Sequence, residues 1–88
     1  MEKKDFKIIN RLGLHARAAA QLVQTANRFR SEITIEKDGM EVNGKSIMGI
    51  LMLAAAQGSQ ISVAVSGDDA QQALNAIGQL IDDGFGES

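Results

Sequence analysis

The chain has 88 residues, of which 44% are hydrophobic and 23% are charged, and its formal net charge is -2 at pH 7. This length leaves room for one small core, so we predict a single domain over residues 1–88 without a large enclosed cavity. The slight negative charge and the scarcity of aromatic residues argue against nucleic-acid binding, and the absence of cysteine excludes disulfides and zinc-thiolate sites.

Neither the N-terminus nor any internal segment predicts export or membrane insertion. The first ten residues, MEKKDFKIIN, mix charges of both signs and lack the apolar core of a signal peptide. The longest apolar run, Ile47 to Ala56, has ten residues, about half of the roughly 20 that span a bilayer. We therefore predict a cytoplasmic protein that contacts no membrane.

The first half of the chain predicts a strand, a helix and a hairpin. Residues 5–9 (DFKII) place Phe6 and Ile8 on one face, the period-two pattern of a strand with one buried side. From Ala16 onward, apolar residues recur at helical spacing as far as Phe29. Residues 33–42 then alternate on both sides of Lys37-Asp38-Gly39, a strong turn signal that is typical of a hairpin.

The second half predicts a short helix, a strand and a longer helix. Ser46 is a good N-cap for the very apolar residues 47–53. Residues 61–65 alternate as a final strand, and residues 70–81 keep helical spacing. The whole order predicts an α+β open-faced sandwich, in which three helices cover one face of a four-stranded, mainly antiparallel sheet. The other sheet face should meet water and carries Lys7, Thr34, Glu36, Glu41 and Ser62.

His15, the only histidine, lies where the loop around Gly13 meets the first helix. The free N–H groups and the dipole of a helix N-terminus attract anions and disfavour a protonated ring, so one ring nitrogen keeps a lone pair that can attack a phosphoryl group. The amides of Ala16 and Arg17 and the Arg17 guanidinium would then receive the phosphate oxygens. A lone histidine is more often a surface or packing residue, but histidine is not a preferred N-cap, and Gly13 allows a ligand to come close.

Two motifs resemble those of a known family. Gly13-Leu14-His15-Ala16-Arg17 is similar to the active-site motif of the histidine-containing phosphocarrier protein (HPr) family of the bacterial phosphotransferase system. Lys45-Ser46-Ile47-Met48-Gly49 is similar to the regulatory serine motif of that family, and the resemblance covers essentially the whole chain. It implies the same sandwich fold, with His15 accepting phosphate from enzyme I, itself charged by phosphoenolpyruvate, and passing it to enzyme IIA-type acceptors.

The resemblance further implies a carrier with a covalent phosphohistidine and not an enzyme, and it implies no cofactor. One histidine and dispersed carboxylates also predict no metal site. We predict a monomer, because transient docking needs only one open face. The resemblance is compatible with both the sugar-uptake and the nitrogen-regulatory branch of the system, and residues 50–53 and 82–86 look somewhat like the nitrogen-regulatory branch. Ala18 replaces the family's usual proline, which predicts a looser first helical turn with unchanged chemistry.

Ser46 has two interpretations. On spacing alone it is an ordinary N-cap worth about 1 kcal/mol, whereas the resemblance implies a site for an HPr kinase/phosphorylase. The helix that follows has more apolar residues than one buried stripe can hold, so some must face water. These exposed residues are either apolar residues that the small core cannot hold or a surface that binds a partner. The resemblance implies that Ile47, Met48 and Leu51 border the His15 site and dock partners.

Other interpretations compete with a phosphoryl carrier. The main alternative is a non-phosphorylating docking domain on the same scaffold, and a true enzyme comes third because no second acid-base group accompanies His15. Among the charges, we predict that Arg11, Arg17 and Lys45 form a basic rim at the site. We predict that the acidic residues around the last helix, Glu87 among them, are solvated ends, and that Asp68 and Asp69 suit the helix dipole.

Overall fold

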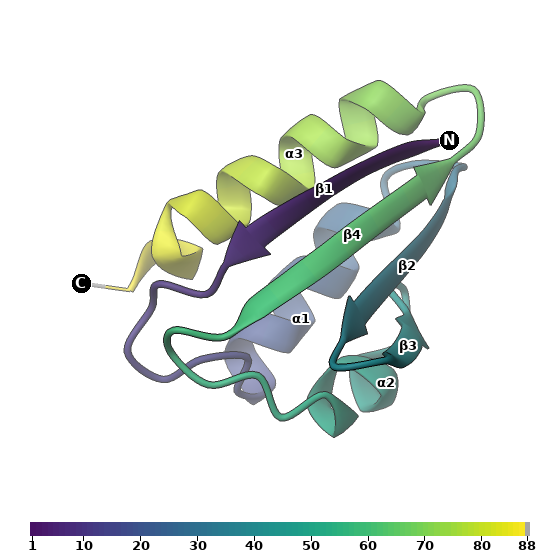
Figure 1. Ribbon diagram of the computed structural model, residues 1–88. Coiled ribbons are helices and arrows are strands. Elements are labelled where there is room, and N and C mark those ends of the chain that lie inside the picture. Colours follow the sequence, from purple (N-terminus) through teal and green to yellow (C-terminus); the bar gives the residue numbers. More distant parts are fainter. Residues whose placement is uncertain (88) are drawn as a thin grey trace.

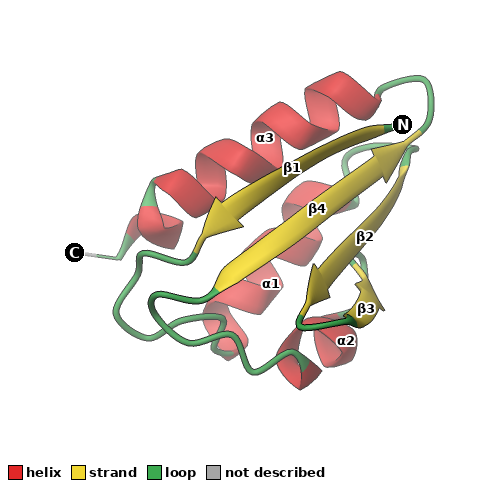
Figure 2. Ribbon diagram, viewed as in Figure 1, coloured by secondary structure: helices red, strands yellow, loops and turns green. Residues whose placement is uncertain are grey.

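The computed structural model describes residues 1–87, and its elements follow the predicted order. They are β1 (Glu2–Lys7), α1 (Ala16–Ala26), β2 (Glu32–Lys37), β3 (Met40–Asn43), α2 (Ile47–Met52), β4 (Gln60–Ser66), α3 (Ala70–Asp82) and a 3-10 turn, η1 (Gly84–Gly86). The strands form one sheet in the order β1-β4-β2-β3 with antiparallel neighbours throughout (Figure 1). Figure 2 shows strands and helices as two layers, which confirms the predicted open-faced sandwich. Within residues 1–87, no helix is both long and apolar enough to cross a bilayer.

The core lies between the sheet and its helices. Alternate side chains of a strand point to one face, and in β2 and β4 the side chains on the helix side are buried. Helices α1 and α3 close this core with residues at helical spacing, such as Leu22 and Ile77, both fully buried. The opposite sheet face carries Lys7 and Glu41, which are exposed, and Thr34, Glu36 and Ser62, which are half-buried. That face is the water-facing one that the alternation predicts.

The largest differences from the prediction are the start of β1, the end of α1 and one additional turn. β1 begins at Glu2 because its backbone pairs with β4 as far as Val65, although side chains before Phe6 show no buried pattern. α1 ends at Ala26 and not at Phe29, since the Phe29 N–H bonds to the Ala26 carbonyl in a tighter turn. The turn η1 had no signal in the hydrophobic pattern. It lies after α3 and turns the chain back toward the entrance of α1.

Asp69 links the start of α3 to the segment before β2. Its carboxylate accepts hydrogen bonds from the Arg30 N–H (2.9 Å), the Ser31 N–H (3.0 Å) and the Ser31 hydroxyl, and it makes no capping bond to its own helix. The bond from the Ser31 hydroxyl, followed by the one from Arg30, lowers the pKa of Asp69 below its ordinary value. Asp69 therefore holds two segments together, a role more specific than the dipole interaction that the sequence predicts.

We expect Asp69→Asn to lower the melting temperature at pH 7 and to reduce its sensitivity to acid. Because the folded state depresses the pKa of Asp69, the stabilisation is present above the ordinary value of 3.8 and is lost as pH falls through the lower folded value. Circular dichroism melts at pH 7 and at about pH 2 measure both effects. Asp68→Asn removes an equal charge one residue earlier and is the control. Equal acid sensitivity of Asp69→Asn and the wild type would contradict this role.

Candidate functional site

His15 is the N-cap residue of α1, as its place at the loop-to-helix junction predicts. Its backbone is extended (φ -74°, ψ 178°), and its Nδ1 accepts a hydrogen bond of 3.2 Å from the Arg17 N–H. About a quarter of its side chain is exposed. The first turn of α1 contains no acidic residue, so no carboxylate of the helix itself offsets the positive end of its dipole. The ring therefore faces a helix entrance that favours an anion.

The other ring nitrogen of His15 contacts Glu87. Nε2 lies 2.7 Å from Glu87 Oε2, across 72 residues of sequence. An amide N–H can only donate, so Nδ1 carries a lone pair toward Arg17, and the proton of the neutral ring is on Nε2, which donates to the carboxylate. Both nitrogens thus have assigned roles in the hydrogen bonds: Nδ1 has the lone pair and Nε2 is the donor.

The prediction that Glu87 is a solvated end is wrong. Buried Phe85 anchors the C-terminal segment, and Gly84, Phe85 and Gly86 all have positive φ values, of 64°, 56° and 73°. Three successive left-handed residues reverse the chain after α3 and bring Glu87 to the ring. The sequence signal that indicates such a chain reversal is the pair of glycines on either side of Phe85 in GFGE.

Asn10 completes the site and was also missed by the sequence analysis. Asn10 is 4% exposed, and its Nδ2 donates to Glu87 Oε2 and to the Gly13 carbonyl, each at 2.7 Å. The bond from His15, and then that from Asn10, lowers the pKa of Glu87 against the opposing effect of burial. Glu87 is therefore an ionised acceptor at neutral pH, held between the ring and a buried amide.

Gly13 attaches the His15 loop to the segment that follows α2. Its φ of 67° is left-handed, and the next residue, Leu14, donates its N–H to the Ala55 carbonyl at 2.8 Å. Ala16 and Arg17 follow His15 as the first two residues of α1, and both are exposed. A cavity of about 30 Å³ lies between this helix entrance and the C-terminal segment, lined by His15, Arg17, Gln21, Phe85, Gly86 and Glu87.

The structure places Ser46 as the N-cap of α2, with its Oγ accepting a hydrogen bond of 3.1 Å from the Gly49 N–H. Ile47 and Met48 are 42% and 71% exposed, as expected for residues outside the buried stripe. Leu51 is half-buried and packs against the core, which leaves less of it for a partner. Leu12, in the loop that leads to His15, is 65% exposed. The periodicity of apolar residues did not predict this exposed leucine.

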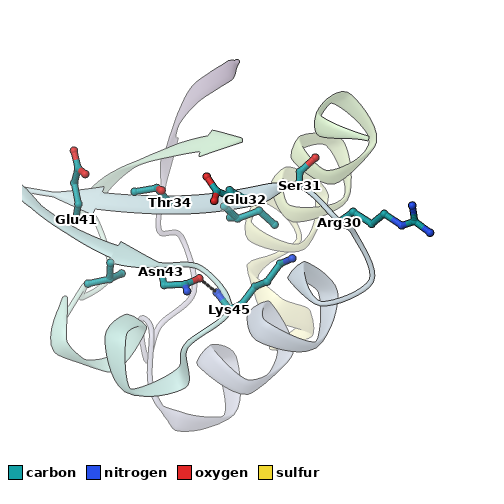
Figure 3. Close-up of a pocket in the computed structure, with 9 residues that line it drawn as sticks. Arg30, Ser31, Glu32, Thr34, Glu41, Asn43 and Lys45 are labelled. Atoms are coloured by element: carbon teal, nitrogen blue, oxygen red, sulfur yellow. Dashed lines mark hydrogen bonds between the residues drawn. The ribbon is translucent and has the colours of Figure 1, made fainter. Parts of the chain in front are cut away.

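Lys45 does not join a basic rim at His15, contrary to the prediction. Its Nζ donates to the Phe29 carbonyl at 2.7 Å, beyond the C-terminal end of α1, while His15 is at the N-terminal end. A hollow of about 440 Å³ lies between the start of β2 and the end of β3, and Lys45 is one of the residues that line it (Figure 3). The Asn43 side chain accepts the Lys45 N–H there at 2.8 Å, as the dashed line in Figure 3 shows.

Ala18→Pro tests the departure from the family motif. The Ala18 amide is in the first turn of α1, where N–H groups lack partners within the helix, so we expect proline to raise the unfolding free energy by about 0.4–1 kcal/mol. Urea denaturation measures this gain. Ala20→Pro, two residues further, should instead cost about 3 kcal/mol, because it removes an intrahelical bond. A loss of stability in Ala18→Pro would mean that this buried position does not accommodate the proline ring.

The chain is similar to known proteins along nearly its whole length. A family profile described as the PTS HPr component phosphorylation site matches residues 2–83. A phosphocarrier protein HPr of Neisseria meningitidis is 49% identical over 87 residues, which cover 99% of this chain and 98% of the relative. Two crystal structures from Thermoanaerobacter tengcongensis are similar in fold: HPr-C-His (TM-score 0.97, 46% identity, 100% and 99% of the two chains) and an HPr dimer (TM-score 0.80, 47% identity, 99% and 100%).

Proposed function

Because the chain belongs to the HPr family of phosphocarrier proteins of the phosphotransferase system, we propose that His15 is its phosphoryl acceptor. Phosphorylated enzyme I, charged by phosphoenolpyruvate, is the donor, and an enzyme IIA-type protein is the next acceptor. The observation that carries this proposal is the Nδ1 lone pair of His15, held at the N-terminus of α1 by the Arg17 N–H. In this role the protein carries phosphate through a covalent phosphohistidine and catalyses no complete reaction.

The proposed step follows from the local geometry. The Nδ1 lone pair forms a bond to phosphorus while the bond from phosphorus to the donor breaks, and that electron pair leaves with the donor. Nδ1 then no longer accepts from Arg17, so this N–H becomes available for a phosphoryl oxygen, next to the Ala16 N–H and the Arg17 guanidinium. The phosphate thus takes over the capping role of the ring, and the helix dipole offsets its charge.

Ser46 and the exposed start of α2 form the proposed regulatory and docking surface. Ile47 and Met48 offer apolar contact area, and a phosphate added to Ser46 by an HPr kinase/phosphorylase would place negative charge beside them. Half-buried Leu51 would contribute only an edge to this surface. We propose that the protein acts in the cytoplasm as a monomer, although three similar structures are described as dimers.

The function is tested by mass spectrometry of the intact protein, after incubation with phosphoenolpyruvate and enzyme I. We expect one phosphate adduct on the wild type that is lost in acid, as phosphohistidine is and phosphoserine is not. His15→Asn is the matched variant, because asparagine also caps a helix but has no ring nitrogen, so the fold stays intact. An unmodified wild type with several sources of enzyme I, or an adduct on His15→Asn, would contradict the proposal.

A further inference from the structure

We propose that Glu87, held by Asn10, is a positioning residue that keeps the proton on Nε2 of His15 both before and after phosphorylation. This inference rests on the proposed function of His15 and names the group that controls its ring. Before phosphorylation, Oε2 of Glu87 accepts from Nε2 at 2.7 Å while Nδ1 faces the Arg17 N–H. The lone pair is therefore already on the nitrogen at the helix entrance when a donor arrives.

The proton matters more after phosphorylation. A ring with phosphorus on Nδ1 and hydrogen on Nε2 is a cation, and when the P–N bond breaks the electron pair returns to Nδ1 and neutral imidazole leaves. Without the Nε2 proton the leaving group is an imidazolate anion, which departs far less readily. The ionised Glu87 carboxylate favours the cationic ring over the neutral one, because opposite charges lie within hydrogen-bond distance. Glu87 thereby keeps the carried phosphate transferable.

Two unfavourable features support the view that this geometry serves function. Asn10 uses Nδ2 on both Glu87 and the Gly13 carbonyl, and its buried Oδ1 has no hydrogen-bond partner among residues 1–87. Phe85, which anchors the turn before Glu87, is a bulky residue at φ 56°, a costly backbone conformation for any residue other than glycine. Both features belong to the groups that bring Glu87 to the ring.

A purely structural role for Glu87 is the alternative that the test must exclude. In that role Glu87 only links the segment after α3 to the loop before α1, where its Oε1 lies 3.4 Å from the Leu12 amide nitrogen. The two roles differ in their dependence on pH. If Glu87 has only this structural role, Glu87 variants should change the rate of P–N hydrolysis by the same factor at every pH. A proton-holding role predicts a defect only where the phosphorylated ring of the variant has lost its Nε2 proton.

The test uses the full chain phosphorylated by phosphoramidate, a small-molecule donor to histidine rings, so that no partner protein is required. Glu87→Gln keeps the size of the side chain and removes its charge, and Asp82→Asn removes an equal charge from the exposed end of α3 as a control. Phosphorus NMR follows the titration of the phosphorylated ring, and loss of the same signal gives the rate of P–N hydrolysis across pH. Melting temperatures verify that each variant is folded.

In Glu87→Gln we expect the phosphorylated ring to titrate about one pH unit lower than in the wild type. P–N hydrolysis should be slower by up to about tenfold above that titration and equal to the wild type below it. Asp82→Asn should match the wild type throughout. An unchanged titration, or a rate change of the same size at every pH, would overturn the inference. Failure of enzyme I to phosphorylate the wild type would instead contradict the proposed function.

Discussion

Gly13→Ala is expected to destabilise the protein and to slow phosphorylation of His15. A Cβ at this position would lie 2.5 Å from the Ala55 carbonyl oxygen and 2.9 Å from Ala56 Cα, both backbone atoms that cannot rotate away. The left-handed φ of 67° alone costs about 1–3 kcal/mol for a residue with a side chain. Relief of the contact requires the loop to shift. This shift breaks the hydrogen bond from the Leu14 N–H to the Ala55 carbonyl and displaces the ring of His15, which is two residues after Gly13. Urea denaturation and the rate of phosphorylation measure the two effects.

Gly58→Ala is the matched control for Gly13→Ala. Gly58 also has a positive φ, of 92°, but a Cβ there would meet no atom of residues 1–87 within 4 Å. This variant therefore carries the backbone cost alone and should be phosphorylated at the wild-type rate. If Gly13→Ala loses no more stability than Gly58→Ala and is phosphorylated equally fast, the contact with Ala55 does not position His15.

Ile50→Ala is expected to lower the free energy of unfolding by about 2–5 kcal/mol, the usual cost of truncating a fully buried isoleucine. Within α2, residues 47–52, Ile50 alone is buried, so it anchors a helix that is too short to be stable by itself. Loss of the Ile50 side chain leaves a cavity under α2 and weakens the attachment of the proposed docking surface. Chemical denaturation followed by circular dichroism measures the change.

The exposed residues of the same helix should behave in the opposite way. We expect Ile47→Ala and Met48→Ala to change the free energy of unfolding by less than about 0.5 kcal/mol, because both side chains face water. They should weaken the binding of enzyme I, measured by calorimetry. Full binding by both variants would remove the start of α2 from the docking surface, and a cost below about 1 kcal/mol for Ile50→Ala would contradict its role as the anchor.

Local rules predicted most of the fold and half of the site. The change from period two to period 3.6 placed His15 at a helix entrance, and the N-cap preference of serine placed Ser46, both as the structure has them. Each prediction depended only on residues within one or two turns. The alternation of apolar residues likewise predicted which sheet face is buried. A shift of a strand by one residue would move all of its apolar side chains to the water-facing side.

The missing half of the site depends on contacts between distant residues. Glu87 reaches His15 across 72 residues through three left-handed residues, and no periodicity encodes such a reversal. Lys45 was misplaced for a related reason: its closeness in sequence to Ser46 suggested the histidine site, whereas its ammonium group bonds beyond the far end of α1. Asp69 resembled a helix cap and instead binds a segment 38 residues away.

The most direct measurement is NMR of the phosphorylated protein with ¹⁵N-labelled histidine. Because the chain has one histidine, every ring signal belongs to His15, and phosphorus–nitrogen coupling identifies the nitrogen that carries phosphate. We predict coupling to Nδ1 with a proton retained on Nε2, as the bonds to Arg17 and Glu87 require. Coupling to Nε2, or a phosphorylated protein whose histidine ring is unmodified, would contradict the assignment of His15 Nδ1 as the acceptor.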